Sequence, residues 1–236
     1  LTVHSQVIDT FEPHYLDLLQ LAEKDPHSAF EQLQKIDVGG FSNPKKAEFL
    51  YYKSIILSYL DYPNKSLDSA TEGLKLVSLQ EQPWLYHFLT LEKINAWDSL
   101  GIGSKGFVEA KNALSWGKEN NYLQLQLNAI FLLTNLYTRV GDYEKALILA
   151  KEGYEIAPSE GVNFIKNNFT ALTSGIYISR GEYELALPYL KKTYQHEKNK
   201  GNNLGISVLL FELGRANIAI GNFEKGVEEL NESIKL

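Results

Sequence analysis

The sequence contains no cysteine and no methionine among its 236 residues. The lack of cysteine excludes disulfide bonds, thiolate metal sites and cysteine nucleophiles together. It says little about compartment, because a cysteine-free chain tolerates both oxidising and reducing surroundings. The chain begins at Leu1 without an initiator methionine, so we expect that a leader has been cleaved or that the chain has been trimmed.

Long apolar runs and excess positive charge are also missing. No apolar run approaches the ~18 residues of a membrane span, so we expect no membrane contact by this segment. The net charge is −6, and no basic stripe of the kind found in nucleic-acid binders is present. With 44% hydrophobic and 22% charged residues, the composition is typical of a folded soluble protein.

A short phrase of glycine, polar residue and aromatic recurs in the C-terminal half of the chain. Gly141, Gly181 and Gly221 are evenly spaced, and each is followed by Asp, Glu or Asn and then by Tyr or Phe. Apolar residues at helical spacing precede and follow each glycine. A fixed period of this size indicates stacked supersecondary units, and each unit is predicted to be helix, tight turn, helix.

Each part of the phrase has a predicted role at the corner between two helices. The glycine can take the left-handed conformation that closes the first helix. Asp142 and Asn222 are expected to cap the second helix, whereas Glu182 is a poorer cap and predicts a looser junction. A small residue early in the second helix is expected to let the two helices approach closely. In the last three units these small residues are Ala146, Ala186 and Gly226.

The phrase resembles the tetratricopeptide repeat (TPR) family. That family places a small residue and an aromatic in the first helix, a glycine at the turn, an alanine early in the second helix and a proline after it. The interval between the glycines is longer than the usual repeat of that family, which implies longer helices or linkers. The matching residues of one unit are Thr134, Tyr137, Gly141, Tyr143, Ala146 and Pro158.

Weaker copies extend the repeat toward the N-terminus, with small residues at Ala29, Ser66 and Ala110. The resemblance therefore implies an all-α, right-handed TPR-like superhelical solenoid of about six antiparallel helix pairs. The last helix ends without a stop signal, and we expect the array or another domain to continue beyond Leu236. The predicted single array covers 1–236, with helix pairs at about 11–37, 44–78, 83–119, 122–157, 162–198 and 202–236.

No residue pattern indicates catalysis, a cofactor or a metal site. The segment GIGSKG, residues 101–106, matches G-x-G-x-x-G, but it follows a helix and not the strand that a dinucleotide site needs. A glycine-rich helix-to-helix loop is the favoured interpretation. The histidines lack the His-x-x-x-His spacing that puts two ligands on one helix face, and no G-x-S-x-G elbow is present. We therefore predict that this chain is not an enzyme.

In the TPR family the stacked first helices line a concave groove that receives peptides or partner helices. By that register Asn95 and Asn135 would stack, and an asparagine can both donate to and accept from a peptide backbone. Arg139 and Arg215 could hold a carboxylate. The full set of expected groove residues is Tyr51, Tyr52, Tyr59, Phe88, Asn95, Asp98, Asn128, Phe131, Asn135, Arg139, Asn168, Phe211 and Arg215.

The family's best-known peptide clamp has a lysine one helical turn before such an asparagine. Here those positions hold Leu91 and Phe131, so the chaperone-tail clamp is not matched. The resemblance instead implies a more apolar and aromatic groove, suited to a helix or a hydrophobic peptide. A protein or peptide is the expected partner.

Several functions are consistent with such a groove. The segment AEKDPHSAFEQLQKI resembles the first repeat in extracytoplasmic sensor regions of bacterial GGDEF diguanylate cyclases and histidine kinases. This resemblance implies a periplasmic location, a membrane helix after the array and an output domain. A stand-alone cytoplasmic TPR adaptor or chaperone-like protein is an alternative. A peptide-responsive regulator is another, because such proteins have an array of similar repeat length with a DNA-binding head.

Overall fold

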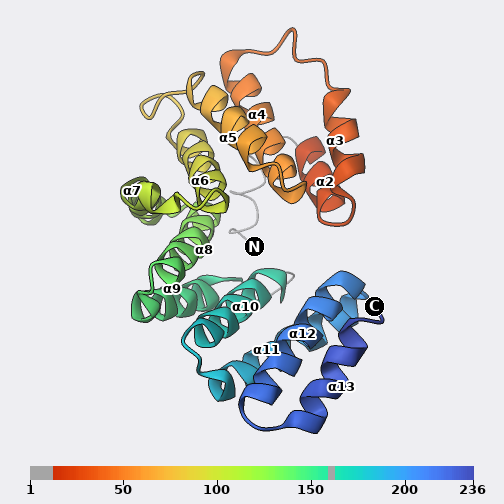
Figure 1. Ribbon diagram of the computed structural model, residues 1–236. Coiled ribbons are helices and arrows are strands. Elements are labelled where there is room, and N and C mark those ends of the chain that lie inside the picture. The colour runs from red at the N-terminus through yellow and green to blue at the C-terminus, as the bar shows by residue number, and fades with distance from the viewer. Residues whose placement is uncertain (1–12, 159–162) are drawn as a thin grey trace. The chain divides into compact units, whose positions relative to one another are not determined.

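The computed structural model describes residues 13–158 and 163–236, and these form helices joined by short turns, with no strand among them (Figure 1). The all-α fold is therefore confirmed, and the helices form the six predicted pairs. Residues 11, 12 and 162 of the predicted pairs lie outside the described residues. The pairs are α2 (Pro13–Ala22) with α3 (Pro26–Gln34), α4 (Asn43–Tyr59) with α5 (Pro63–Leu74), α6 (Pro83–Ser99) with α7 (Phe107–Glu119), α8 (Leu123–Arg139) with α9 (Tyr143–Ile156), α10 (Asn163–Ser179) with α11 (Tyr183–Lys200), and α12 (Asn203–Ala219) with α13 (Phe223–Ser233).

From α4 onward the architecture repeats at one constant interval. The first helices of the pairs begin at positions 43, 83, 123, 163 and 203, and all of them have the same length. The repeat is therefore as regular in the second and third pairs, where the sequence motif is weak, as in the last three. Residues separated by one repeat interval hold equivalent positions in the first helices, which allows the faces of these helices to be compared directly.

The turns explain the length of the repeat. Left-handed residues (φ between 54° and 88°) lie at 61, 101, 121, 141, 181, 201 and 221. In each case the next N–H donates to a carbonyl in the last turn of the preceding helix, as from Asp142 to Tyr137 (2.9 Å) and from Tyr122 to Gly117 (2.8 Å). This is the bond that closes a helix with a left-handed residue after it. The turns within the last five pairs and the turns between pairs at Asn121 and Gly201 share this closure, so one helix with its turn takes half of the repeat interval there.

The small residues at the corners lie where two helices meet. Ala146 and Ala186 are fully buried. A Cβ added to Gly226 would lie 2.7 Å from the carbonyl oxygen of Gly214, so no side chain fits there without a shift of the helices. The predicted close approach is confirmed for these three positions.

In the third pair the sequence assignment of the small corner residue was wrong. The position one repeat interval before Ala146 is Gly106, and a Cβ on Gly106 would lie 2.5 Å from Cγ1 of Ile94. Ala110 is buried one turn further along the helix. A short 3-10 helix, η1 (Gly103–Gly106), precedes α7, so the GIGSKG segment forms the corner and the start of the second helix.

Only one of the two predicted caps forms. The Asp142 carboxylate accepts from the backbone N–H of Lys145 at 3.3 Å. The side chain of Asn222 makes no such bond; its Nδ2 donates instead to Oδ1 of Asn217 at 3.3 Å. Glu182 also makes no cap bond, and it pairs with Arg180 at 2.7 Å.

The contacts of the chain group into two compact units, unit 1 (residues 1–132) and unit 2 (residues 133–236), with the boundary inside α8. The sequence predicts one continuous array and contains no signal for this division. The described part of unit 1 has a cluster of aromatic rings within a mainly aliphatic core: the ring of Tyr15 stacks on Tyr52 (4.6 Å), and Tyr51 packs on Phe88 (5.5 Å).

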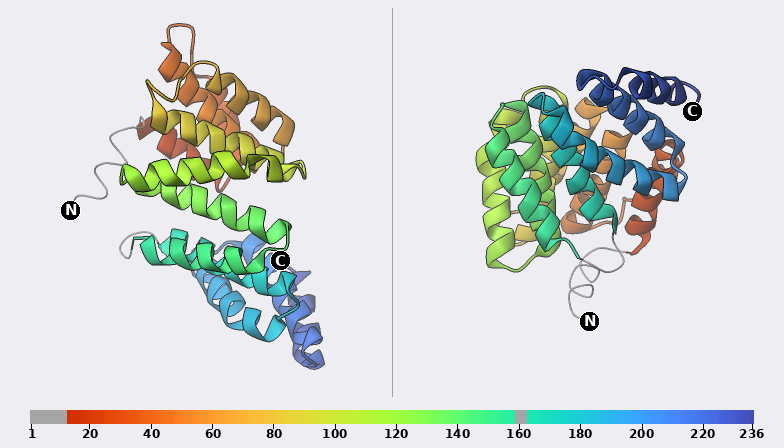
Figure 2. Two further views of the ribbon diagram at one scale, coloured as in Figure 1. Left: turned by 90° about the vertical axis from the view of Figure 1, so that its left-hand side faces the viewer. Right: turned by 90° about the horizontal axis from the view of Figure 1, so that it is seen from below.

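Unit 2 has an aliphatic core built on its second helices, whose pairing with the first helices can be followed in Figure 2. Ala186 and Leu190 of α11 pack with Leu213 and Ala216 of α12, and residues of α10 join the same cluster. α10 and α12 are thus both anchored on α11. Within the described residues, no helix has the length and hydropathy to cross a membrane, and no group of three His, Asp or Glu could hold a metal ion.

Candidate functional site

α12, the first helix of the sixth pair, exposes an apolar stripe. Leu204, Val208 and Phe211 have 77%, 55% and 47% of their surface exposed, and Arg215 follows them. Spacings of four, three and four put these side chains on one side of the helix. The opposite side is buried through Leu213 and Ala216 against α11. Phe211 and Arg215 were predicted as groove residues, and Leu204 and Val208 extend that set.

The equivalent face of α10 has smaller and more polar residues. Asn168 is partly buried, and the register of the repeat makes it the equivalent of Val208. Gly175, which is equivalent to Arg215, has no atom within 4 Å of the place where a Cβ would stand. This part of α10 therefore leaves open space beside the helix. On α8, Asn135 is partly buried and Arg139 is exposed at the helix end.

Arg215 is already engaged within its own helix. Its Nη1 donates to both carboxylate oxygens of Glu212 at 3.2 Å, and its guanidinium lies 5.6 Å from the ring centre of Phe211. The pair is partly exposed, and exposed ion pairs of this kind are weak. A ligand carboxylate would have to replace Glu212 at Arg215.

In unit 1, four of the predicted groove residues are buried and cannot line an open surface. Tyr51, Tyr52, Phe88 and Asp98 belong to the interior. Three of them are covered by ring packing: Tyr51 packs against Tyr52 and Phe88, and Phe88 packs against Tyr122 at 5.8 Å. The groove prediction for these four residues was wrong, because the three rings fill the space between the helices and Asp98 is also buried.

The remaining predicted residues of unit 1 stay at least partly accessible. Tyr59 is 48% exposed at the end of α4, and Asn95 is partly buried on α6. Phe131 is exposed on α8. Asn128 is partly buried, and its Oδ1 accepts from Nε2 of Gln124 at 3.1 Å.

Glu92 is a residue of this face that sequence reasoning missed. It lies just under one helical turn before Asn95 on α6 and is partly buried. Burial raises the pKa of Glu92 to about 7, and a hydrogen bond with Asn95 opposes that rise. Burial, with Glu23 and Glu92 nearby, also raises the pKa of Tyr59 to about 12. In the sequence, Glu92 could have been noticed as the one acidic residue within the largely apolar segment HFLTLEKINAW.

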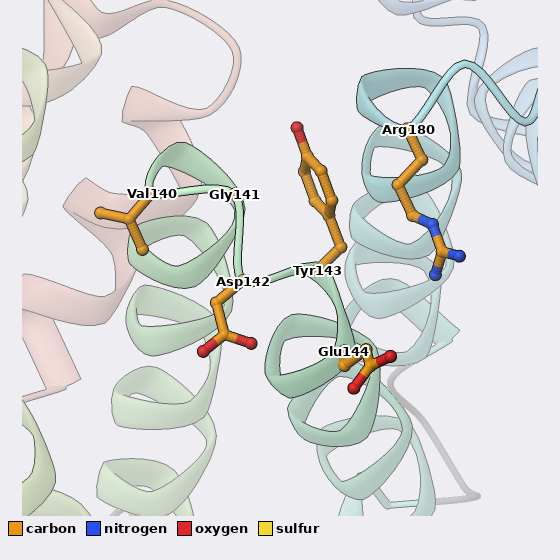
Figure 3. A pocket seen from close by; sticks show the side chains of 6 residues that line it. All are labelled: Val140, Gly141, Asp142, Tyr143, Glu144 and Arg180. Carbon is orange, nitrogen blue, oxygen red and sulfur yellow. The ribbon is translucent and has the colours of Figure 1, made fainter.

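A hollow of about 520 Å³ lies at the α8–α9 corner, where Figure 3 shows Tyr143 standing between the turn and Arg180. Three of its polar side chains have partners within the fold. The phenol of Tyr143 donates to the carbonyl of Ser179 at 3.2 Å, Asp142 binds Lys145, and Arg180 binds Glu182. We assign this corner a structural role, as the sequence motif predicts.

No family model matches this chain, and no curated protein matches it. A solved structure, described as "Crystal structure of NprR in complex with its cognate peptide NprX", is similar with a TM-score of 0.69 and 19% sequence identity. The similarity covers 94% of this chain and 65% of the NprR chain. At this identity the likeness shows the fold alone, and it supports the all-α, TPR-like repeat fold. The chain spans less than two thirds of the length of NprR.

Proposed function

We propose that this chain is a non-catalytic, peptide-binding scaffold and the regulatory part of a larger bacterial signalling protein. The exposed stripe Leu204, Val208 and Phe211 on α12 carries the proposal. A cluster of large apolar side chains on one exposed face is typical of an interaction site. A peptide laid along the first helices would bury them.

The surroundings of the stripe suit a peptide with apolar side chains. Asn168 on the equivalent face of α10 and Asn135 on α8 carry amides, which can donate to and accept from a peptide backbone. The open space beside Gly175 leaves room for a bulky residue. The complex of NprR with its cognate peptide supports a peptide as the class of ligand, because the two chains share their fold.

Selection from a random peptide library, followed by calorimetry with the enriched peptides, tests the proposal. The double variant Val208→Ser with Phe211→Ser is expected to weaken binding at least about tenfold, since each lost apolar contact removes on the order of 1 kcal/mol or more. The control is Ile148→Ser on α9, a residue that is 67% exposed on a second helix. Equal affinities for the wild type and the double variant would remove the stripe from the binding site.

We propose two cellular contexts for this scaffold. The similarity to NprR favours a peptide-responsive regulator, which we would place in the cytoplasm. The resemblance of the first repeat to extracytoplasmic sensor regions favours a periplasmic position. The full-length gene product separates the two: a DNA-binding domain supports the regulator, and an apolar span of ~20 residues after the array supports the sensor. A chain with neither would be a stand-alone adaptor.

A further inference from the structure

A second hollow of unit 2 lies among α9, α10 and α11 and shares no residue with the α12 stripe. Its volume is about 560 Å³, within the range of ~300–1,000 Å³ that is usual for small-molecule sites. We call it the Tyr154 pocket. Its lining residues are Leu147, Ala150, Lys151, Tyr154, Glu155, Thr170, Thr173, Tyr177, Tyr189 and Lys192.

The inner part of the Tyr154 pocket is uncharged and has an aromatic wall. Ala150 and Thr170 are buried at its base. The rings of Tyr177 and Tyr189 lie 5.7 Å apart and tilted by 35°. Such a surface accepts a flat or branched apolar group, because aromatic faces supply a large contact area.

Gly153 of α9 is in tight contact with α10 beside the pocket. A Cβ at that position would lie 2.3 Å from the ring of Phe169 on α10. The absence of a side chain at Gly153 therefore lets the Phe169 ring pack directly on the backbone of α9. This contact holds the next residue, Tyr154, at a defined place beside the pocket.

The mouth of the pocket is positively charged and centred on one phenol. Nζ of Lys192 donates to the Tyr154 hydroxyl at 3.0 Å and lies 4.9 Å from its ring centre. Nζ of Lys166 lies 5.5 Å from the same ring. The bond from Lys192 is the main reason that the pKa of Tyr154 is held below its usual value. Lys151 also lines the mouth, and its Nζ lies 3.8 Å from Oε1 of Glu155. Glu155 is the only acidic residue among the lining residues.

We propose that the Tyr154 pocket binds a ligand in which a carboxylate is joined to an apolar body of about the size of a benzyl group. The carboxylate would accept from Lys192 and from the Tyr154 hydroxyl, and the apolar body would lie against Tyr177 and Tyr189. A neutral apolar ligand would take water from the Lys192 ammonium without supplying an anion, and a bare inorganic anion would leave the aromatic wall unused. A free organic acid and the C-terminal residue of a peptide both have this chemistry.

Calorimetry with three matched probes tests the proposal on the whole chain. N-acetyl-phenylalanine mimics a peptide C-terminus, 3-phenylpropionate is a simple organic acid, and N-acetyl-phenylalaninamide has the body of the first without its charge. At least one acid is expected to bind, and the amide about tenfold or more weakly than N-acetyl-phenylalanine, since hydrogen bonds to charged groups are the stronger ones. Preference for the acetylated acid would indicate a peptide end, and preference for 3-phenylpropionate a free acid.

Variants at the mouth locate the binding. Lys192→Gln and Tyr154→Phe change exposed side chains, and each is expected to weaken binding of the acid about tenfold. Lys191→Gln is the matched control, because Lys191 is the exposed neighbour of Lys192 and does not line the pocket. Absence of binding by both acids, equal binding of the amide, or equal losses in Lys191→Gln and Lys192→Gln would each overturn the proposal. The α12 double variant should bind the acid normally, so this test is independent of the proposed peptide site.

Discussion

At the scale of single residues, Glu92 is a group whose charge is strongly altered by the fold. Its pKa rises from 4.5 to about 7, chiefly because of burial. At pH values between 4.5 and about 7, Glu92 keeps its proton in the folded chain and has lost it in the unfolded chain. The free energy of unfolding must therefore decrease as the pH rises through this window, and the destabilisation is complete above the folded pKa.

The variant Glu92→Gln tests this coupling. We expect it to unfold at a higher urea concentration than the wild type at pH 8, because glutamine cannot ionise. The difference should vanish near pH 4, where the carboxyl is protonated in both states. Glu144→Gln, on the exposed side of α9, is the control. A gain that is the same at pH 4 and pH 8 would show that Glu92 is not held protonated by the fold.

Two glycines in helix interiors of unit 2 should respond to alanine in opposite directions. At Gly153 a Cβ would collide with the Phe169 ring at 2.3 Å, whereas at Gly175 nothing lies within 4 Å. Gly153→Ala is expected to cost about 1–3 kcal/mol through overpacking. Gly175→Ala should gain about 0.5–1 kcal/mol, because alanine is the better helix former. Urea unfolding measures both, and a loss of stability in Gly175→Ala would contradict the open space beside α10.

At the scale of elements, the sequence predicted the corners better than the faces. The motif at Gly141, Gly181 and Gly221 located three turns, because glycine is the usual residue in the left-handed position. It missed Asp61 and Asn121, which adopt the same conformation (φ 57° and 54°). In a sequence, a polar residue in this conformation cannot be distinguished from any other loop residue, so the regular spacing of these left-handed turns could not be seen.

The candidate face was harder to predict for a different physical reason. Helical register places Tyr51, Phe88, Asn128, Phe131 and Phe211 on the first helices, but register does not say how far neighbouring helices close over a side chain. In unit 1 the rings of Tyr51 and Phe88 pack on neighbouring rings and are buried, whereas Phe131 stays exposed. In unit 2 the equivalent positions stay open, since α10 carries small residues there.

The shared turn geometry makes a paired prediction at the element scale. Gly181→Ala is expected to lose about 1–2 kcal/mol, because a Cβ is strained at φ 75°. Asp61→Gly should be neutral or stabilising by up to about 1 kcal/mol, since the strain at φ 57° is relieved. Thermal unfolding of both variants measures this. The shared closure would be contradicted if Asp61→Gly were the more damaging of the two.

At the scale of the whole molecule, the contacts form two compact units although the helices keep one period. In the described part of unit 1 (1–132) a cluster of aromatic rings packs within the core, and in unit 2 (133–236) the cluster around α11 and α12 is aliphatic. In repeat proteins each element contacts only its neighbours, so stability is approximately a sum of local terms. A defect in one unit should therefore be felt first by the helices of that unit.

Hydrogen exchange of two matched glycine variants tests this locality. Gly106→Ala places a Cβ 2.5 Å from Ile94 in unit 1, and Gly153→Ala places one 2.3 Å from Phe169 in unit 2. The first variant is expected to speed amide exchange in α6 and α7 and to leave α11 to α13 near wild type; the second should reverse this pattern. The reason is that opening requires only the contacts of the damaged unit to break. Equal acceleration along the whole chain in both variants would show that the array unfolds as one cooperative body, and the division into two units would then have no energetic meaning.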